Sequence, residues 1–245
     1  MVSLADETAW EAALREGAAE LGLPLPESAL SSYQRHFTLL RQHNARAGLT
    51  SLVDPVEIAV KHYLDSLTCL LATEVRPGEA VADLGSGGGF PGLVLAVARP
   101  EARYTLVDSS ARRADFLRLA AEDLGLTNVS VITGRAEGVG RDPEHRERYD
   151  LVVSRAVASL PVLLEYGLPL ARVGGRVLAM KGPEAEEEIA SAQGALEVLG
   201  GRVEGMCTLS LPRALGRRAL ILIEKVTATP ERYPRRAGIP AKRPL

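Results

Sequence analysis

The sequence predicts an α/β fold in which helices cover both faces of a parallel sheet. From Ala80 onward, short apolar runs alternate with stretches of helical periodicity, which is the pattern of strands joined by crossover helices. Two further apolar runs after the last helix predict an antiparallel final strand. Before Ala80 the apolar spacing is helical, which predicts an N-terminal helical extension to the sheet.

The extension, residues 1–78, is expected to form a helical cap against the main domain. Leu14, Ala18 and Leu21 share one face of its first helix, and Gly22 ends that helix. The second helix is expected to bury four apolar or aromatic side chains at helical spacing: Leu30, Tyr33, Phe37 and Leu40.

A third helix of the cap has the clearest start signal. Asp54 suits the N-cap, Pro55 suits the first helical position, and Glu57 would complete a capping box. Apolar residues at helical spacing predict its buried stripe: Val56, Val60, Leu64, Leu67 and Leu71.

The main domain, residues 79–228, contains the expected sheet. Its predicted strands are Ala80–Leu84, Arg103–Val107, Val129–Ile132, Tyr149–Val153, Arg176–Met180, Met206–Leu211 and Ala219–Lys225. Its predicted helices are Pro91–Ala98, Ala111–Leu124, Leu160–Ala171 and Pro183–Leu199. Residues 229–245 are rich in Pro and Arg, and we expect an irregular basic tail.

The formal net charge of −2 conceals an uneven distribution of charge. Residues 1–82 carry 11 acidic and 6 basic side chains, whereas the remainder carries 20 acidic and 23 basic ones. A near-neutral chain can therefore present a basic face to a nucleic acid, and the tail concentrates arginine there.

Cysteine usage and hydropathy indicate the cellular compartment. Cys69 and Cys207 lie far apart and have no Cys or His partner at ligand spacing, which argues against a disulfide framework or a bound metal. No apolar stretch reaches the length of a bilayer span, and no secretion signal is evident. We expect a cytoplasmic monomer that binds neither metal nor membrane.

A glycine-rich loop is predicted between the first strand of the sheet and the next helix: Asp83-Leu84-Gly85-Ser86-Gly87-Gly88-Gly89-Phe90-Pro91-Gly92. In open α/β sheets, ligands bind at this end of the strands. The loop also fits the dinucleotide pattern G-x-G-x-x-G, but Pro91 removes an N–H that a pyrophosphate would use. The spacing Asp83-x-Gly85-x-Gly87-x-Gly89 resembles the loop of methyltransferases that bind S-adenosylmethionine, which has no phosphate. The alternative is a purely structural glycine turn.

Further candidate ligand residues follow the ends of the later strands. Asp108 could accept hydrogen bonds from both ribose hydroxyls of an adenosine, and its alternative role as a helix N-cap suits Ser110 better. The segment Gly134-Arg135-Ala136-Glu137, after the third strand, would border the adenine mainly through backbone groups. Arg155 follows the fourth strand and would lie at the floor of the same cleft; its alternative is a surface position.

Taken in order, these motifs resemble the small-subunit rRNA guanine-N7 methyltransferase family, known as RsmG or glucose-inhibited division protein B. The resemblance covers nearly the whole chain and includes, besides the loop, His62-Tyr63-Leu64-Asp65-Ser66-Leu67, Asp108 with Arg112-Arg113, Ser154-Arg155-Ala156, Lys181-Gly182 and Tyr233-Pro234-Arg235-Arg236. One departure is visible: Gly48 stands where the family's N-x-x-x-N-L-T segment has its second asparagine.

The resemblance implies a Rossmann-like class I methyltransferase fold, with S-adenosyl-L-methionine as cofactor and S-adenosyl-L-homocysteine as product. It implies methylation of a guanine at N7 in a decoding-site loop of 16S rRNA, with the small ribosomal subunit or an assembly intermediate as partner. Cofactor contacts are expected at Gly85, Gly87, Gly89, Phe90, Asp108, Ser109, Ser110, Ala136, Glu137 and Arg155.

The chemistry of guanine N7 agrees with this sequence. N7 carries an in-plane lone pair and is unprotonated at neutral pH, so in-line methyl transfer needs positioning and no general base. No catalytic residue is evident, and Arg155, Lys181 and His62 are candidates for positioning alone. The motif typical of adenine-N6 methylation is missing after the fourth strand, and both cysteines fit core positions better than a nucleophile's.

RNA binding is expected from basic side chains around the cleft mouth, because phosphate contacts dominate affinity. The candidates are Arg112, Arg113, Arg118, Lys181, Arg235, Arg236 and Lys242. Each of them, taken alone, also fits a solvated surface position. His62 and Asp65 could line the cleft or could satisfy each other at a helix surface.

Three other functions fit part of the sequence. A methyltransferase of small metabolites would leave the basic tail unexplained. A non-catalytic ribosome-binding or RNA-binding protein could keep the nucleotide fold. A nicotinamide-dependent oxidoreductase is disfavoured by Pro91 and by the glycine spacing.

Overall fold

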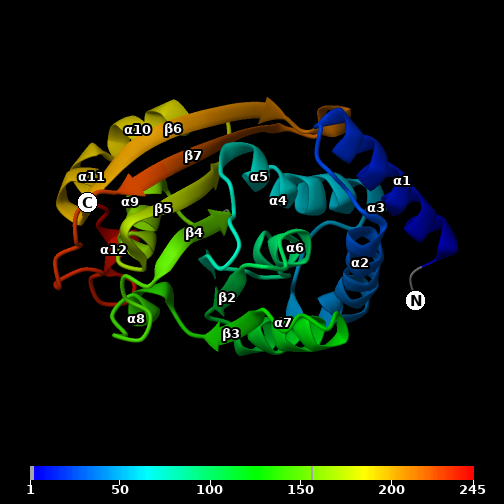
Figure 1. Cartoon of the computed structure of the whole chain (residues 1–245), viewed down its shortest axis with the longest axis horizontal. Helices are drawn as coiled ribbons and strands as arrows, with labels where there is room; N and C mark the ends of the chain where they lie inside the picture. The colour runs from blue at the N-terminus through cyan, green and yellow to red at the C-terminus, as the bar shows by residue number, and fades with distance from the viewer. Residues whose placement is uncertain (1–2, 156) are drawn as a thin grey trace.

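The computed structural model describes residues 3–155 and 157–245; Ala156, the last residue of the Ser154-Arg155-Ala156 motif, lies outside them. Across the described residues, one seven-stranded sheet has the order β3-β2-β1-β4-β5-β7-β6 (Figure 1). Its strands are β1 (Ala80–Leu84), β2 (Arg103–Asp108), β3 (Val129–Thr133), β4 (Tyr149–Arg155), β5 (Ala171–Lys181), β6 (Gly201–Ser210) and β7 (Arg217–Lys225). Strands β1 to β5 are parallel, and β7 runs antiparallel between β5 and β6. The predicted fold class is confirmed.

Two long helices and a segmented one precede the sheet, as expected for the cap. They are α1 (Leu4–Glu20), α2 (Glu27–Ala47), α3 (Pro55–Ile58), the π-helical η1 (Ala59–Leu64), α4 (Asp65–Leu67) and α5 (Cys69–Ala72). Asp54 caps α3 by accepting the Glu57 N–H at 2.8 Å. The Glu57 carboxylate pairs with Lys61 one turn on, so the predicted capping box is only half formed.

The buried stripe predicted for this third helix is correct at its centre and wrong at its end. Val60, Leu64 and Leu67 are fully or almost fully buried, whereas Leu71 is 43% exposed. The wider π turn of η1 and the break before α5 rotate the following residues away from the apolar face, because they interrupt the 3.6-residue period.

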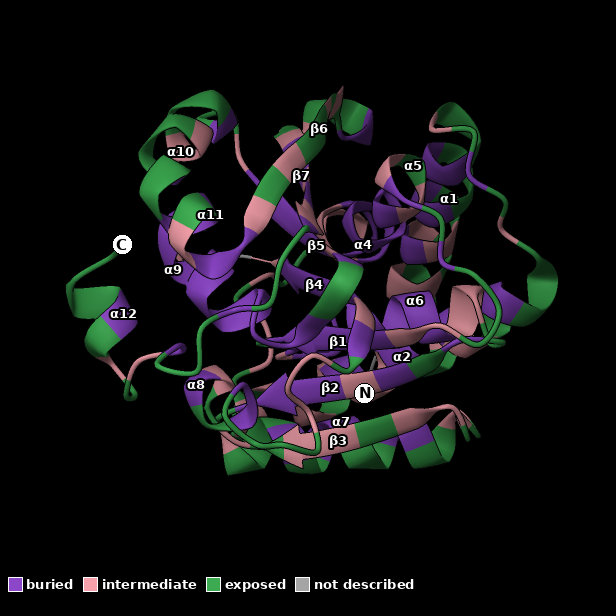
Figure 2. Ribbon diagram, turned by 60° about the vertical axis from the view of Figure 1, so that its left-hand side comes forward, coloured by how far each residue is buried: buried purple, intermediate pink, exposed green. Residues whose placement is uncertain are grey.

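Helices cover both faces of the sheet (Figures 1 and 2). They are α6 (Gly92–Ala98), α7 (Ala111–Asp123), α8 (Ala136–Val139), α9 (Leu160–Gly167), α10 (Ala185–Ser191) and α11 (Gln193–Leu199), followed by the short 3-10 helix η2 (Pro212–Ala214) and by α12 (Ile239–Lys242). Helix α9 ends before Pro169, which cannot continue a helix, so the expected extension to Ala171 is wrong. The expected helix from Pro183 is divided at Ala192 into α10 and α11.

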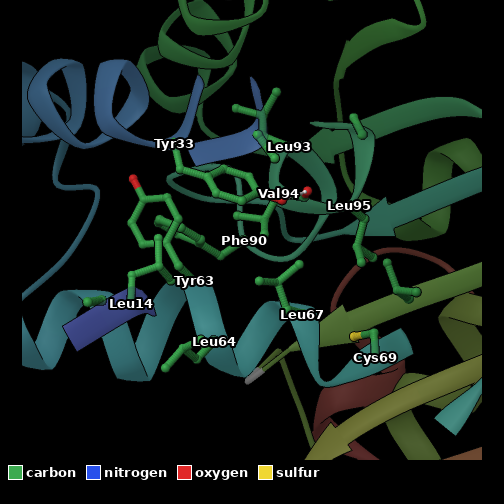
Figure 3. Packing of buried hydrophobic residues seen from close by; sticks show 14 of the residues in the cluster. Leu14, Tyr33, Tyr63, Leu64, Leu67, Cys69, Phe90, Leu93, Val94 and Leu95 are labelled. Atoms are coloured by element: carbon green, nitrogen blue, oxygen red, sulfur yellow. Dashed lines mark hydrogen bonds between the residues drawn. The ribbon is translucent and has the colours of Figure 1, made fainter. Parts of the chain in front are cut away.

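Alternate residues of each central strand enter two separate cores, as the period of two requires. In β1, Val81 belongs to the core shared with α1, α2, α6 and α7, while Ala82 and Leu84 face the core under α9 and α11. In the first core Trp10 stacks on Phe37 with ring centroids 5.1 Å apart, and the Tyr33 hydroxyl donates to the Val94 carbonyl at 2.9 Å (Figure 3 shows Tyr33 and Val94). The cap and the sheet therefore share one continuous apolar core.

Residues 229–245 fold back onto the sheet domain instead of remaining irregular throughout. Tyr233 is 8% exposed, and the last helix, α12, lies beside α9 (Figure 1). The guanidinium groups of Arg141 and Arg146 donate to the Pro234 and Tyr233 carbonyls, both at 2.7 Å. We call residues 229–245 the C-terminal strap.

Within the described residues, no helix is both long and apolar enough to cross a membrane.

Candidate active site

The glycine loop joins β1 to α6 at the carboxyl end of the sheet. Gly85, Gly87 and Gly89 have φ values of +74°, +54° and +94°, the left-handed region that glycine adopts without steric cost. At Gly85 a Cβ atom would lie 2.5 Å from Cγ2 of Val157. The conformation and the close contact together explain why the loop requires glycine there.

Asp83 ties the loop to α6. Its Oδ2 accepts the Gly92 N–H at 2.9 Å, which satisfies one of the free donors at the start of that helix. Its Oδ1 is buried and has no partner among the described residues. Burial raises the pKa of this carboxyl to about 6. Asp83 therefore stabilises the loop from the protein interior. It does not line either of the two cavities beside the loop.

Two cavities open beside the loop and share Gly85 and Arg155 as a common wall. The first, of about 600 Å³, lies between the loop, η1 and the end of β5. The second, of about 380 Å³, lies over the ends of β2 and β3. We call them the first and the second cavity.

The second cavity contains much of the predicted cofactor site. Asp108, Ser109, Ala136 and Glu137 line it together with the shared residues. Asp108 is 4% exposed, and its oxygens accept the backbone N–H groups of Gly87 at 2.9 Å and Ser110 at 2.8 Å. Each carboxylate oxygen retains a lone pair for a ligand hydroxyl.

The other predicted cofactor residues lie elsewhere around the loop. Gly87 and Phe90 line the first cavity. Gly89 and Ser110 line neither cavity. Ser110 occupies the N-cap position of α7, but its side chain makes no capping hydrogen bond, so the capping role that the sequence suggested for it is wrong. Its N–H is instead held by Asp108.

The C-terminal strap completes the second cavity through Gly238 and Ala241. The Glu137 carboxylate accepts the Gly238 N–H at 2.8 Å. The Arg235 guanidinium donates several hydrogen bonds to the carboxylate of Glu165 on α9, and the Glu165 side chain is 0% exposed. Sequence reasoning missed Gly238, Ala241 and also Tyr166 of α9, because no local pattern brings the strap to the ends of β2 and β3.

Side chains from β4, η1, α4, β7 and the glycine loop line the first cavity around Arg155. Its guanidinium donates to the Lys61 carbonyl at 2.7 Å and to Asp65 at 3.2 Å, and it lies over the Phe90 ring at 5.3 Å. Asp65 is 1% exposed and also accepts from Arg218 at 2.9 Å. His62 and Asp65 both line the cavity, and Asp65 is satisfied by arginines rather than by His62.

His62 is held as a neutral imidazole. Its ring stacks on Phe90 with centroids 4.6 Å apart, and its Nε2 lies 2.7 Å from the Thr50 hydroxyl. Its Nδ1 lies 3.1 Å from the Lys61 carbonyl, which can only accept a hydrogen bond, and 3.2 Å from the Arg155 guanidinium, which can only donate one, so these two contacts favour opposite tautomers of the ring. Burial, and then the charge of Arg155, lower the pKa of His62 to about 3. His62 is therefore not a base that titrates near neutral pH.

His36 supports the same region from the core and leads to a prediction about acid stability. Burial lowers its pKa to about 4, and its Nδ1 lies 3.0 Å from the Tyr63 hydroxyl. The pKa of His36 is lower in the folded chain than in the unfolded chain, so the neutral buried ring contributes fully to stability above about pH 6.5. This contribution is lost toward pH 4, at about 1.4 kcal/mol per pH unit. The raised pKa of Asp83 has the opposite effect on stability, because it favours the folded chain as the pH falls below about 6.

We expect His36→Phe to reduce the loss of unfolding free energy between pH 6.5 and pH 4 by about 3 kcal/mol, because the unfolded chain then binds one proton fewer. Urea unfolding of both proteins at four pH values in this window measures the difference. Parallel pH profiles would show that folding does not lower the pKa of His36.

The basic residues predicted to bind RNA lie in three different environments. Arg113 lines the second cavity, while Arg112 lines a smaller groove with His43 and Arg46 between α2 and α7. Arg236 and Lys242 are exposed on the strap. The other nominated side chains are bound within the molecule: Arg118 to Asp115 and Thr133, Lys181 to Glu188, and Arg235 to Glu165.

The departure at Gly48 is explained by backbone conformation. Gly48 ends α2 with φ 63° and ψ 53°, the left-handed region that glycine and asparagine adopt most readily. The neighbouring Asn44 carboxamide accepts the N–H groups of Leu49 and Thr50, and Thr50 in turn contacts His62. The exchange at position 48 therefore preserves the helix end and the support of the first cavity.

Residues 29–217 match the family model described as rRNA small subunit methyltransferase G. The chain is 49% identical over 232 residues to the ribosomal RNA small subunit methyltransferase G of Pelotomaculum thermopropionicum, covering 95% of this chain and 97% of that protein. It is likewise 49% identical over 245 residues to the protein of the same name from Symbiobacterium thermophilum, covering 98% and 100%.

A solved structure shows the same fold at low sequence identity. A variant of the 16S rRNA (adenine(1408)-N(1))-methyltransferase from Catenulisporales acidiphilia superimposes with a TM-score of 0.52 at 16% identity, covering 64% of this chain and 95% of that one. The fold is thus that of a class I methyltransferase. Given the family match and the near full-length relatives, the chain belongs to the rRNA small subunit methyltransferase G family.

Proposed function

We propose that this methyltransferase moves a methyl group from S-adenosylmethionine to N7 of a guanine in 16S rRNA, within the small ribosomal subunit or an assembly intermediate in the cytoplasm. The observation that carries the proposal is the pair of cavities that share Gly85 and Arg155. One cavity suits an adenosine, and the other has room for a flipped base. A wall common to both is where donor and acceptor atoms would meet.

The residues of the second cavity fit the adenosine part of the cofactor. Asp108 has lone pairs for the ribose hydroxyls, and Ala136 and Glu137 border the space beside it. Gly85 lets the loop lie close against Val157 at the wall of this cavity, where a Cβ would clash with that side chain. When bound, the cofactor supplies a methyl group activated on a sulfonium sulfur.

The chain's own contribution is orientation and exclusion of water, because guanine N7 needs no proton removed. Phe90 is 3% exposed and supports the wall between the cavities (Figure 3 shows it beside Tyr63). Asp65 and the Lys61 carbonyl fix the guanidinium of Arg155. The neutral His62 lines the first cavity, where the guanine would bind, and it does not compete for a proton.

Methyl transfer from labelled cofactor tests the proposal. We expect label in small-subunit particles, at N7 of one guanine, and none in small amines. Comparison of particles, assembly intermediates and naked 16S rRNA identifies the substrate form. Absence of label from RNA in every form, with retained affinity for the particles, would favour a non-catalytic ribosome-binding protein.

We expect Asp108→Ala to weaken cofactor binding by about 30-fold, which corresponds to about 2 kcal/mol, because it removes the ribose acceptor and releases two backbone donors of the loop. Titration calorimetry with S-adenosylmethionine measures the change. Asp115→Ala is the matched control, since Asp115 is exposed on α7 and, among the described residues, its side chain pairs only with Arg118. Unchanged affinity in the Asp108 variant would refute the role of this carboxylate.

A further inference from the structure

Lys181 and Glu188 form an ion pair inside the first cavity. Lys181 is the last residue of β5, and Glu188 lies on α10. The Lys181 ammonium donates to Glu188 Oε2 at 2.6 Å, and the two side chains are 8% and 27% exposed. Both line the cavity that also contains Gly85 and Arg155.

Backbone contacts fix this pair in one orientation. The Lys181 ammonium also donates to the Ala158 carbonyl at 2.5 Å, and Glu188 Oε2 accepts the Leu160 N–H at 2.7 Å. Among the described residues, Glu188 Oε1 accepts no hydrogen bond, and two of the three ammonium hydrogens of Lys181 are used. One donor and one acceptor therefore remain side by side.

The other charged side chains of the cavity, and His62, have partners within the protein. Both oxygens of Asp65 accept from arginines, and Lys61 pairs with Glu57. His62 contacts Thr50 and Arg155. Glu188 thus provides the carboxylate oxygen of this cavity that is free to accept a hydrogen bond from a ligand.

A donor beside an acceptor complements one edge of guanine. Guanine presents the O6 acceptor next to the N1–H donor, whereas adenine presents the N6 amino donor next to the N1 acceptor. The same pair would therefore attract guanine and repel adenine. The exocyclic O6 lies between N1–H and N7 along the outer edge of the base. A guanine held through O6 and N1–H therefore keeps N7 free for the reaction.

We propose that the Lys181–Glu188 pair reads the O6/N1–H edge of the target guanine and determines the base specificity of the reaction, an inference that rests on the proposed function. Lys181 donates its third hydrogen to O6, and Glu188 Oε1 accepts from N1–H. A buried polar pair discriminates strongly, because the wrong base leaves both groups without partners.

Base analogues at the target position test this assignment in the wild-type enzyme. Small subunits are reconstituted with guanine, inosine or 2-aminopurine at the methylated position, and initial rates are measured. Inosine keeps O6, N1–H and N7, so its rate should stay within about 3-fold of the guanine rate. 2-Aminopurine keeps N7 and loses O6 and N1–H, so its rate should fall by about 100-fold.

Glu188→Gln provides the complementary test. The donors Lys181 and Leu160 N–H hold the amide oxygen at the Oε2 position, which places the amide NH₂ where Oε1 stood. That NH₂ opposes guanine N1–H and suits the unprotonated N1 of 2-aminopurine. We expect the guanine rate to fall by about 30-fold and the preference over 2-aminopurine to shrink from about 100-fold to about 3-fold.

Glu187→Gln, on the exposed face of α10, is the matched control and should behave as wild type in every assay. Calorimetry should give wild-type cofactor affinity for both variants, because neither residue lines the second cavity. The inference is overturned if wild type methylates 2-aminopurine as fast as guanine, or if Glu188→Gln slows both bases equally, which is what a structural ion pair would do. Failure of wild type to methylate guanine would overturn the proposed function itself, and this inference with it.

Discussion

Replacing Arg235 by alanine should lower the free energy of unfolding by about 3–5 kcal/mol, because the change leaves a buried carboxylate without its partner. Glu165 is 0% exposed, and Arg235 supplies both its guanidinium and its backbone N–H to that carboxylate. Loss of this ion pair should also disturb the second cavity, because Gly238 and Ala241 of the strap complete its lining. We expect cofactor affinity to fall by about 30-fold, or about 2 kcal/mol.

Urea unfolding and titration calorimetry measure these two effects. Arg236→Ala is a close control, since Arg236 is the adjacent basic residue and is exposed; its effect should stay within about 0.5 kcal/mol. The double change Arg235→Met with Glu165→Leu should recover most of the stability, because an apolar pair can replace a buried ion pair. Equal effects of the two arginine variants would show that the strap is not anchored through Glu165.

Asp65→Ala should be comparably severe, with an expected loss of about 3–5 kcal/mol in unfolding free energy. The carboxylate is 1% exposed and accepts from Arg155 of β4 and Arg218 of β7, so its removal leaves two partly buried guanidinium groups without their acceptor. Because Arg155 forms the wall between the cavities, we expect methyl transfer to fall by about 100-fold, or about 2.7 kcal/mol.

Asp65→Asn separates charge from shape. The amide keeps the volume and one acceptor oxygen, so both losses should be about half as large. Denaturant unfolding and single-turnover methyl transfer on the same preparations provide the two readouts. Wild-type turnover in Asp65→Ala would show that the orientation of Arg155 does not matter to the reaction.

Local patterns predicted the place of each strand, because each contains a short apolar run, but they missed the first five residues of β5 and of β6. The strand Ala80–Leu84 was predicted with its observed limits, and Asp108, taken from its place at a strand end, lies in the second cavity. The helix ends were less predictable, since the π turn of η1 and the division at Ala192 come from packing rather than from composition.

The missing parts of the site come from contacts that are distant in sequence. Arg218 donates to Asp65 although the two lie 153 positions apart in the sequence. The Gly238 N–H donates to Glu137 over a sequence separation of 101 positions. Glu188 lies in a run of glutamates that resembles an ordinary solvated helix face, and only the fold turns it toward Lys181. The partner of Arg235 leaves no local signal either, because Glu165 lies 70 positions away in the sequence.

The position of the strap has a consequence for biosynthesis. Residues 229–245 are synthesised after every strand of the sheet, and chains fold progressively from the N-terminal side as they emerge. A nascent chain that stops after β7 has its complete sheet and lacks Gly238 and Ala241 at the rim of the second cavity. Ligand binding is therefore completed last, because a chain terminated after β7 lacks both the strap's part of the binding site and the partner of the buried Glu165.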